Sequence, residues 1–123
     1  MKYRGGCHCG RVAFELEIEG PIDRVDDCNC SMCSKKGYLH VYATRDQFRL
    51  LTPEGELSSY QFNTRTAVHH FCRTCGIHSF YVPRSHPDGY SVNARCLDGV
   101  NIHDLRIEPF DGIHWESASA KFD

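Results

Sequence analysis

The clearest hydrophobic pattern in the chain is a strict alternation over residues 11–19. Its apolar positions are Val12, Phe14, Leu16 and Ile18, and the acidic positions between them are Glu15, Glu17 and Glu19. Successive side chains of a β-strand point to opposite faces, so this alternation predicts a strand with one buried and one solvent-exposed face. Gly20 and Pro21 follow directly and predict a turn that ends the strand.

Further segments rich in aromatic and β-branched residues predict strands along the rest of the chain. They are residues 38–44, 57–62, 67–71, 77–82 and 90–94. Residues 44–48 predict one short helical turn with Thr44 as its cap, and we find no long segment with a helical period. The pattern therefore predicts one mainly β domain over residues 1–123, with antiparallel sheets and with the cysteines in the loops between strands.

Length and charge narrow the classes of function. The chain has 123 residues, a formal net charge of −2 and an isoelectric point near 6.4. This composition provides no overall basic field for a nucleic acid or an anionic membrane surface. The apolar runs are too short for a membrane helix, and the first residues lack the apolar core of a secretory signal. We therefore expect a cytoplasmic protein that binds neither nucleic acid nor membrane.

Cysteine is the most unusual component, with eight residues, of which seven fall into three tight groups. The groups are Cys7 with Cys9, then Cys28 with Cys30 and Cys33, then Cys72 with Cys75, while Cys96 stands alone. In a reducing compartment such groups hold metal more often than disulfides. Neither C-x-x-C pair opens an evident helix, as a redox pair of the thioredoxin type requires. A C-x-x-C turn can instead direct two sulfurs at one metal ion.

The ligand set favours zinc, since the spacings do not match the ferredoxin patterns of iron–sulfur clusters. Four thiolates fill a closed structural zinc site, whereas three leave one position open, as in a catalytic zinc site. One partition assigns Cys7, Cys9, Cys72 and Cys75 to the closed site and Cys28, Cys30 and Cys33 to the open site. The other assigns Cys30, Cys33, Cys72 and Cys75 to a ribbon-like site and leaves Cys7, Cys9 and Cys28. Spacing alone does not distinguish the two partitions.

Three stretches carry a resemblance to a known family. Residues 6–12 read GCHCGRV, residues 28–35 read CNCSMCSK, and residues 71–76 read FCRTCG. In order and separation they resemble the glutathione-dependent formaldehyde-activating enzyme family, also called the Gfa or centromere-protein-V-like family. The resemblance implies a small Mss4-like domain that binds two zinc ions. It also implies a structural site of Cys7, Cys9, Cys72 and Cys75 and an open site of Cys28, Cys30 and Cys33.

The activity that the resemblance implies is the condensation of formaldehyde with glutathione, formally a carbon–sulfur lyase reaction. Two positions differ from the usual second motif of the family, which reads Cys-His-Cys-x-x-Cys-Arg-Lys: Asn29 stands at the histidine and Ser34 at the arginine. An open zinc position can hold a substrate thiol as its thiolate, so we expect a small thiol and a small aldehyde as substrates. The competing hypothesis is a non-catalytic zinc module that binds a protein partner.

Charged residues beside the cysteine groups are candidates to hold an anionic thiol such as glutathione. These are Lys35, Lys36 and Arg73. His70 and His78 flank the last cysteine pair and are candidates for acid–base chemistry near neutral pH. Cys96 is predicted to be a buried apolar thiol.

Overall fold

The alternating segment near the N-terminus forms the middle strand of a three-stranded sheet in the computed structural model, which describes residues 1–62, 65, 67–84 and 87–114. This strand, β2 (Ala13–Glu17), pairs antiparallel with β1 (Lys2–Gly6) and with β5 (Phe48–Leu50). The apolar side chains of Phe14 and Leu16 are fully buried, whereas Glu17 is exposed. The predicted strand is therefore confirmed, with shorter bounds.

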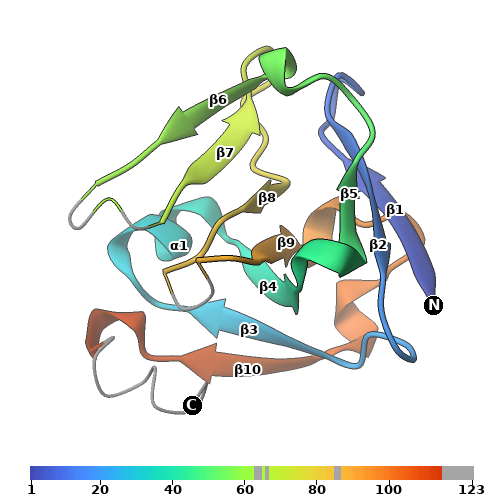
Figure 1. Cartoon of the computed structure of the whole chain (residues 1–123). Coiled ribbons are helices and arrows are strands. Elements are labelled where there is room, and N and C mark those ends of the chain that lie inside the picture. Colours follow the sequence, from blue (N-terminus) through green and yellow to red (C-terminus); the bar gives the residue numbers. More distant parts are fainter. Residues whose placement is uncertain (63–64, 66, 85–86, 115–123) are drawn as a thin grey trace.

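A five-stranded sheet forms the centre of the molecule, with the strand order β10-β3-β4-β9-β8 (Figure 1). Its strands are β3 (Arg24–Cys28), β4 (Leu39–Ala43), β8 (Phe80–Tyr81), β9 (Tyr90–Asn93) and β10 (Arg106–Phe110). All neighbours are antiparallel except β10 and β3, which run parallel. A separate hairpin joins β6 (Leu57–Tyr60) to β7 (His69–Cys72).

Helical structure is confined to short pieces in the described part of the chain. The α-helix α1 (Ser31–Lys36) connects β3 to β4. The 3-10 turns are η1 (Arg45–Gln47), η2 (Glu54–Glu56), η3 (Ala94–Cys96), η4 (Ile102–Asp104) and η5 (Gly112–His114). The turn η1, with Thr44 at its N-cap, confirms the predicted helical turn. No helix among the described residues is long and apolar enough to cross a membrane.

The two faces of the central sheet differ in character. One face packs into the main core, where Val41 of β4, Val92 of β9 and Phe80 of β8 join the buried side chains of the first sheet. The other face carries buried polar groups, namely Asp26, His40, Ser91 and Asn93. The apolar face and the polar face both follow from the alternation of side chains along each strand, because neighbouring residues point to opposite sides of the sheet. The polar face ends at Cys28, the last residue of β3, and so extends to one of the cysteine groups.

The mainly β class with antiparallel sheets is as predicted. Five of the predicted strands match β4, β6, β7, β8 and β9, each with shorter or slightly shifted bounds. The strands β1, β3, β5 and β10 and the helix α1 were not predicted. The reason is physical: β3 contains two aspartates and β10 contains a proline, residue types that are depleted in strands. Pro109 is tolerated because β10 is an edge strand.

Candidate metal centres

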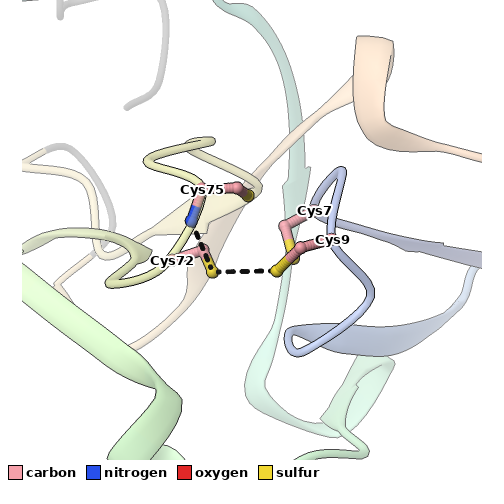
Figure 2. Close-up of side chains that lie close together, drawn as sticks. All are labelled: Cys7, Cys9, Cys72 and Cys75. Carbon is pink, nitrogen blue, oxygen red and sulfur yellow. Dashed lines mark hydrogen bonds between the residues drawn. The ribbon is translucent and has the colours of Figure 1, made fainter.

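Four cysteines from two distant parts of the sequence meet at one point. Cys7 and Cys9 lie on the turn after β1, while Cys72 ends β7 and Cys75 lies in the following turn. Figure 2 shows the first pair facing the second. All four Sγ atoms lie within 4.8 Å of one another, and the Sγ atom of Cys9 is 3.6 Å from those of both Cys7 and Cys72. We call this group the four-cysteine cluster.

Each half of the four-cysteine cluster is shaped by its own backbone turn. In the first half, the backbone N–H of Val12 donates to the Cys7 Sγ over 3.3 Å, and the N–H of Cys7 donates to the Val12 carbonyl over 2.9 Å. In the second half, the N–H of Cys75 donates to the Cys72 Sγ over 3.4 Å. Gly76 then takes a φ of +78°, which a side chain would disfavour. Backbone donors aimed at sulfur stabilise the thiolate form that binds metal.

The geometry of the four-cysteine cluster fits a metal ion rather than disulfides. All eight cysteines are free thiols, and the sulfur separations of 3.6 Å far exceed a disulfide bond of about 2.05 Å. A tetrahedral zinc ion with bonds of about 2.3 Å separates its sulfurs by about 3.8 Å. Spacing had left two partitions open, and the structure groups Cys7, Cys9, Cys72 and Cys75 rather than the ribbon-like set.

The other three grouped cysteines form a second cluster, the three-cysteine cluster. Cys28 ends β3, Cys30 is the N-cap of α1 and Cys33 lies within α1. Their Sγ atoms also lie within 4.8 Å of one another, and the N–H of Cys33 donates to the Cys30 Sγ over 3.2 Å. Hydrogen bonds from the thiols of Cys28 and Cys33 lower the pKa of Cys30. The same hydrogen bonds raise the pKa of Cys28 and of Cys33, so that Cys30 is the sulfur that most readily becomes a thiolate, and the three sulfurs lie close enough together to share a metal ion.

The expectation that neither C-x-x-C pair opens a helix was wrong for Cys30 and Cys33. The six-residue helix α1 begins directly after Cys30, and it is too short to show a helical period in the sequence. The thioredoxin-like context is nevertheless lacking at this pair, because β3 and β4 on either side of α1 run antiparallel, whereas a βαβ unit needs parallel strands.

The C-terminal strand covers the three-cysteine cluster. Phe110 of β10 is buried against the three cysteines, and the N–H of Asn29 donates to the Phe110 carbonyl over 3.1 Å. The Asn29 amide donates to Asp111 Oδ1 over 3.2 Å and accepts from the N–H of Ile113 over 3.0 Å. At Gly112 an added Cβ would lie only 2.4 Å from the Cys28 Sγ. Glycine is therefore the residue that allows the chain to pass this close to the sulfur.

Comparisons with known proteins give matches over most of the chain. The family model for the glutathione-dependent formaldehyde-activating enzyme matches residues 2–116. The chain belongs to this family. The crystal structure of a Rhodobacter sphaeroides protein is also similar, with 42% sequence identity and a TM-score of 0.78. The match covers 86% of this chain and 97% of that one. Membership of the formaldehyde-activating family supports a function of that general type, with glutathione and formaldehyde as the implied substrates.

In this family member, a half-buried lysine lies beside the three-cysteine cluster. The Nζ atom of Lys36 is 4.8 Å from the ring centroid of Tyr38, 4.9 Å from that of Tyr81, and 3.2 Å from the Nδ1 atom of His69. Burial lowers the pKa of Lys36, and the thiolates of Cys33 and Cys30 act in the opposite direction. Lys36 is therefore close enough to Cys33 and Cys30 for their charge to affect its pKa.

The other predicted cations lie elsewhere. Lys35 is exposed, and Arg73 pairs with Glu56, with 3.8 Å between Arg73 Nε and Glu56 Oε2. Of the three candidates, the structure therefore brings only Lys36 into the surroundings of the three-cysteine cluster.

His69 is the histidine that the sequence analysis missed. It is buried, its Nδ1 contacts Lys36, and burial followed by the nearby Lys36 charge lowers its pKa to about 4. His70 points to the other side of β7, where its Nδ1 lies 2.9 Å from the Ser59 Oγ. Burial and then the Lys36 charge also lower the pKa of His78 to about 4. The neighbouring positions on β7 could have indicated that only one of His69 and His70 faces inward.

Cys96 lies outside both clusters and is half-buried. Burial raises the pKa of its thiol, and its Sγ is 3.8 Å from the His78 carbonyl oxygen. Cys96 was predicted to be a buried apolar thiol, and the structure shows a thiol that is only half-buried.

A separate hollow of about 370 Å³ lies at the N-terminal end of β3, whereas Cys28 lies at the other end of the strand. The buried Asp26 and His40 contribute to its lining, as do Arg24 and Arg106. Both arginines pair with Glu108, at 3.5 Å and 3.0 Å. Glu108 therefore neutralises part of the positive charge beside this hollow.

Proposed function

We propose that this member of the family is a zinc-dependent carbon–sulfur lyase. Its substrates would be a small thiol such as glutathione and a small aldehyde such as formaldehyde, joined in a thiol–aldehyde adduct. The observation that carries the proposal is the unequal division of the cysteines into groups of four and three. Four thiolates complete a tetrahedral site, whereas three leave one position for a substrate atom.

In this proposal two zinc ions have different roles. Cys7, Cys9, Cys72 and Cys75 would hold a structural ion, and Cys28, Cys30 and Cys33 would hold the ion at the open site. A zinc ion with three thiolate ligands supplies a position at which a substrate thiol is kept as its nucleophilic thiolate. The thiolate-only ligand set supports this role over activation of water, because three negative ligands reduce the acidifying power of the ion.

The protein itself would contribute shape and shielding at the open site. Phe110 and Gly112 pack against the three-cysteine cluster, so that a substrate must approach from another side. The Asn29 side chain fixes this cover through its hydrogen bonds to Asp111 and Ile113. The free state of all eight thiols also supports action in a reducing compartment such as the cytoplasm.

Metal content and thiol binding test the proposal together. We expect two zinc ions per chain in the wild-type protein and one in a Cys33→Ser variant, while Cys96→Ser retains two. In cobalt-substituted wild-type protein, excess glutathione should change the visible spectrum, because a new thiolate enters the coordination sphere. A spectrum that does not respond to glutathione would contradict thiol binding at this site.

The reaction can be followed by NMR exchange between formaldehyde, glutathione and their adduct. Wild-type protein should accelerate the exchange, and Cys33→Ser should not. Equal exchange rates with and without wild-type protein would exclude this pair of substrates.

A further inference from the structure

We propose that Lys36 forms an anion subsite beside the three-cysteine cluster and binds the aldehyde oxygen as negative charge develops on it. The inference rests on the proposed function, because such an oxygen anion forms only when a thiolate adds to a carbonyl carbon. It adds to that function by identifying a residue that contacts the reacting atoms, and Lys36 lies outside the stretch of the second motif that carries the family resemblance.

The first argument is that the Lys36 ammonium group is held in a fixed place. It lies over the rings of Tyr38 and Tyr81, at 4.8 Å and 4.9 Å from their centroids. Both tyrosines are buried, and cation–π contacts are stronger when they are shielded from water. His69, the third neighbour of the ammonium group, is stacked on Tyr81 with 4.7 Å between ring centroids and 13° between planes. A lysine in such a setting is not an ordinary solvated side chain.

The second argument concerns hydrogen bonds. An ammonium group has three N–H donors and no acceptor, so the Nδ1 atom of His69 must accept from Lys36. Among the described residues, His69 is the one hydrogen-bond partner of Lys36. No carboxylate of a described residue lies within ion-pair distance of the Lys36 ammonium group. At least one donor of the ammonium group is therefore available to a ligand. The positive charge of this half-buried group favours an anion.

The third argument is the position of Lys36 relative to the sulfurs. Lys36 follows Cys33 by three residues in α1, and residues three apart lie on the same side of a helix. Lys35 is only two residues from Cys33 and is exposed. When Cys33 and Cys30 are ionised, their charges interact with Lys36. The cation is therefore on the side of α1 that faces the open site.

The chemical step balances without any further reactant. The substrate thiol loses its proton, and the resulting thiolate sulfur forms a bond to the aldehyde carbon. The carbon–oxygen π bond breaks, and its electron pair moves to the oxygen, which accepts a hydrogen bond from the Lys36 ammonium group. The proton released by the thiol returns through solvent to this oxygen and gives the hydroxyl group of the adduct. In the reverse direction Lys36 stabilises the same oxygen anion as the carbon–sulfur bond breaks.

Formate binding provides a test that does not depend on activity. Formate is a one-carbon oxyanion, and we would titrate it into the zinc-loaded protein with glutathione present while observing the histidine ring signals by NMR. We expect saturable shifts of the His69 signals. We also expect an affinity at least tenfold weaker in Lys36→Met, which keeps an unbranched side chain only one atom shorter but removes its charge. Lys35→Met is the matched control and should bind formate as the wild type does. Equal formate affinity in Lys36→Met and wild type would overturn the proposal.

Kinetics provide the second test. Removing one donor to a developing oxyanion typically costs about 100-fold or more in kcat, so Lys36→Met should lose about that factor while its KM for glutathione changes less than about threefold. Lys36→Arg keeps a cation and should retain more activity than Lys36→Met. A Lys36→Met variant with two zinc ions, a wild-type melting temperature and a kcat within threefold of wild type would also overturn the proposal.

The two proposals can fail separately. If wild-type protein shows neither exchange activity nor a cobalt response to glutathione, the proposed function is wrong. Formate binding that is lost in Lys36→Met would still support the anion subsite in that case, and formate binding unaffected by the substitution would overturn it.

Discussion

The two cysteine clusters use the same ligand type but connect the chain in opposite ways. The four-cysteine cluster joins segments that are far apart, since Cys9 and Cys72 are separated by 63 positions. It links the turn after β1 to the end of β7, which belong to different sheets. The three-cysteine cluster comes from six consecutive residues. A metal ion would therefore hold the tertiary structure together at the first cluster and mainly local structure at the second.

The two clusters also differ in how well the nearby cations are shielded from water. Beside Cys9 lies Arg11, which is exposed and whose pKa is raised by its hydrogen bond to Cys9. The cation beside the three-cysteine cluster is the half-buried Lys36, held against two tyrosines and His69. Charges act more strongly where water is excluded. Under the proposed function, ligand connectivity and local polarity together would distinguish the stabilising site from the reactive one.

The largest difference in stability between the two clusters is expected when one ligand of each is replaced. Cys72→Ser should prevent stable folding, because a structural zinc site contributes on the order of 10 kcal/mol, comparable with the whole stability of a domain. Cys33→Ser should cost only about 1–3 kcal/mol and leave a folded protein with one zinc ion. Circular dichroism during thermal unfolding and metal analysis would measure both effects.

Cys96→Ser is the control for the loss of a thiol, since Cys96 belongs to neither cluster. It should keep two zinc ions and a melting temperature close to that of the wild type. A Cys72→Ser protein that folds as stably as Cys33→Ser would contradict the distinction between the two clusters.

A smaller effect, confined to the three-cysteine cluster, is expected from Gly112→Ala. The new Cβ would lie 2.4 Å from the Cys28 Sγ and 2.9 Å from the Cys30 Cβ, so that either the cover or the sulfurs must move. Such overpacking typically costs about 1–3 kcal/mol. We expect the variant to lose its more weakly held zinc ion at lower chelator concentration, while the second ion is released as in the wild type.

Gly55→Ala is the matched control, because an added Cβ at Gly55 meets nothing within 4 Å. Its two zinc ions should be released at wild-type chelator concentrations. If Gly112→Ala changed only the release of the more tightly held ion, the assignment of the weaker ion to the three-cysteine cluster would be wrong.

Most of the β structure could be predicted from the sequence, because exposed and buried positions alternate clearly in strands such as β2. The strand β3 could not, since its Asp26 is buried on a polar sheet face and breaks the usual link between burial and apolar character. The helix α1 has only six residues, too few for its period to be visible. These two elements, β3 and α1, both lead into the three-cysteine cluster. Local sequence preferences are often violated at functional sites.

The membership of the clusters was only partly predictable. The sequence identified seven grouped cysteines, but the spacing allowed two partitions, because grouping depends on which turns meet in space. The same limit applies to the charged residues. Lys35 and Lys36 are equivalent neighbours in the sequence, and only the orientation of α1 shows that Lys36 is the one beside Tyr38 and His69.

The smallest expected effect concerns Asn29, which stands where the family's usual motif has histidine. Asn29→Ala would remove the hydrogen bonds to Asp111 and Ile113 and should cost about 1 kcal/mol, measured by chemical denaturation. Because these bonds tie the cover to the three-cysteine cluster, the more weakly held zinc ion should also dissociate a few-fold faster. Asn101→Ala removes a comparable exposed hydrogen bond, to the N–H of His103, and should lower stability without changing zinc dissociation. Equal zinc dissociation rates in the two variants would show that the Asn29 side chain stabilises the chain end but does not secure the cluster.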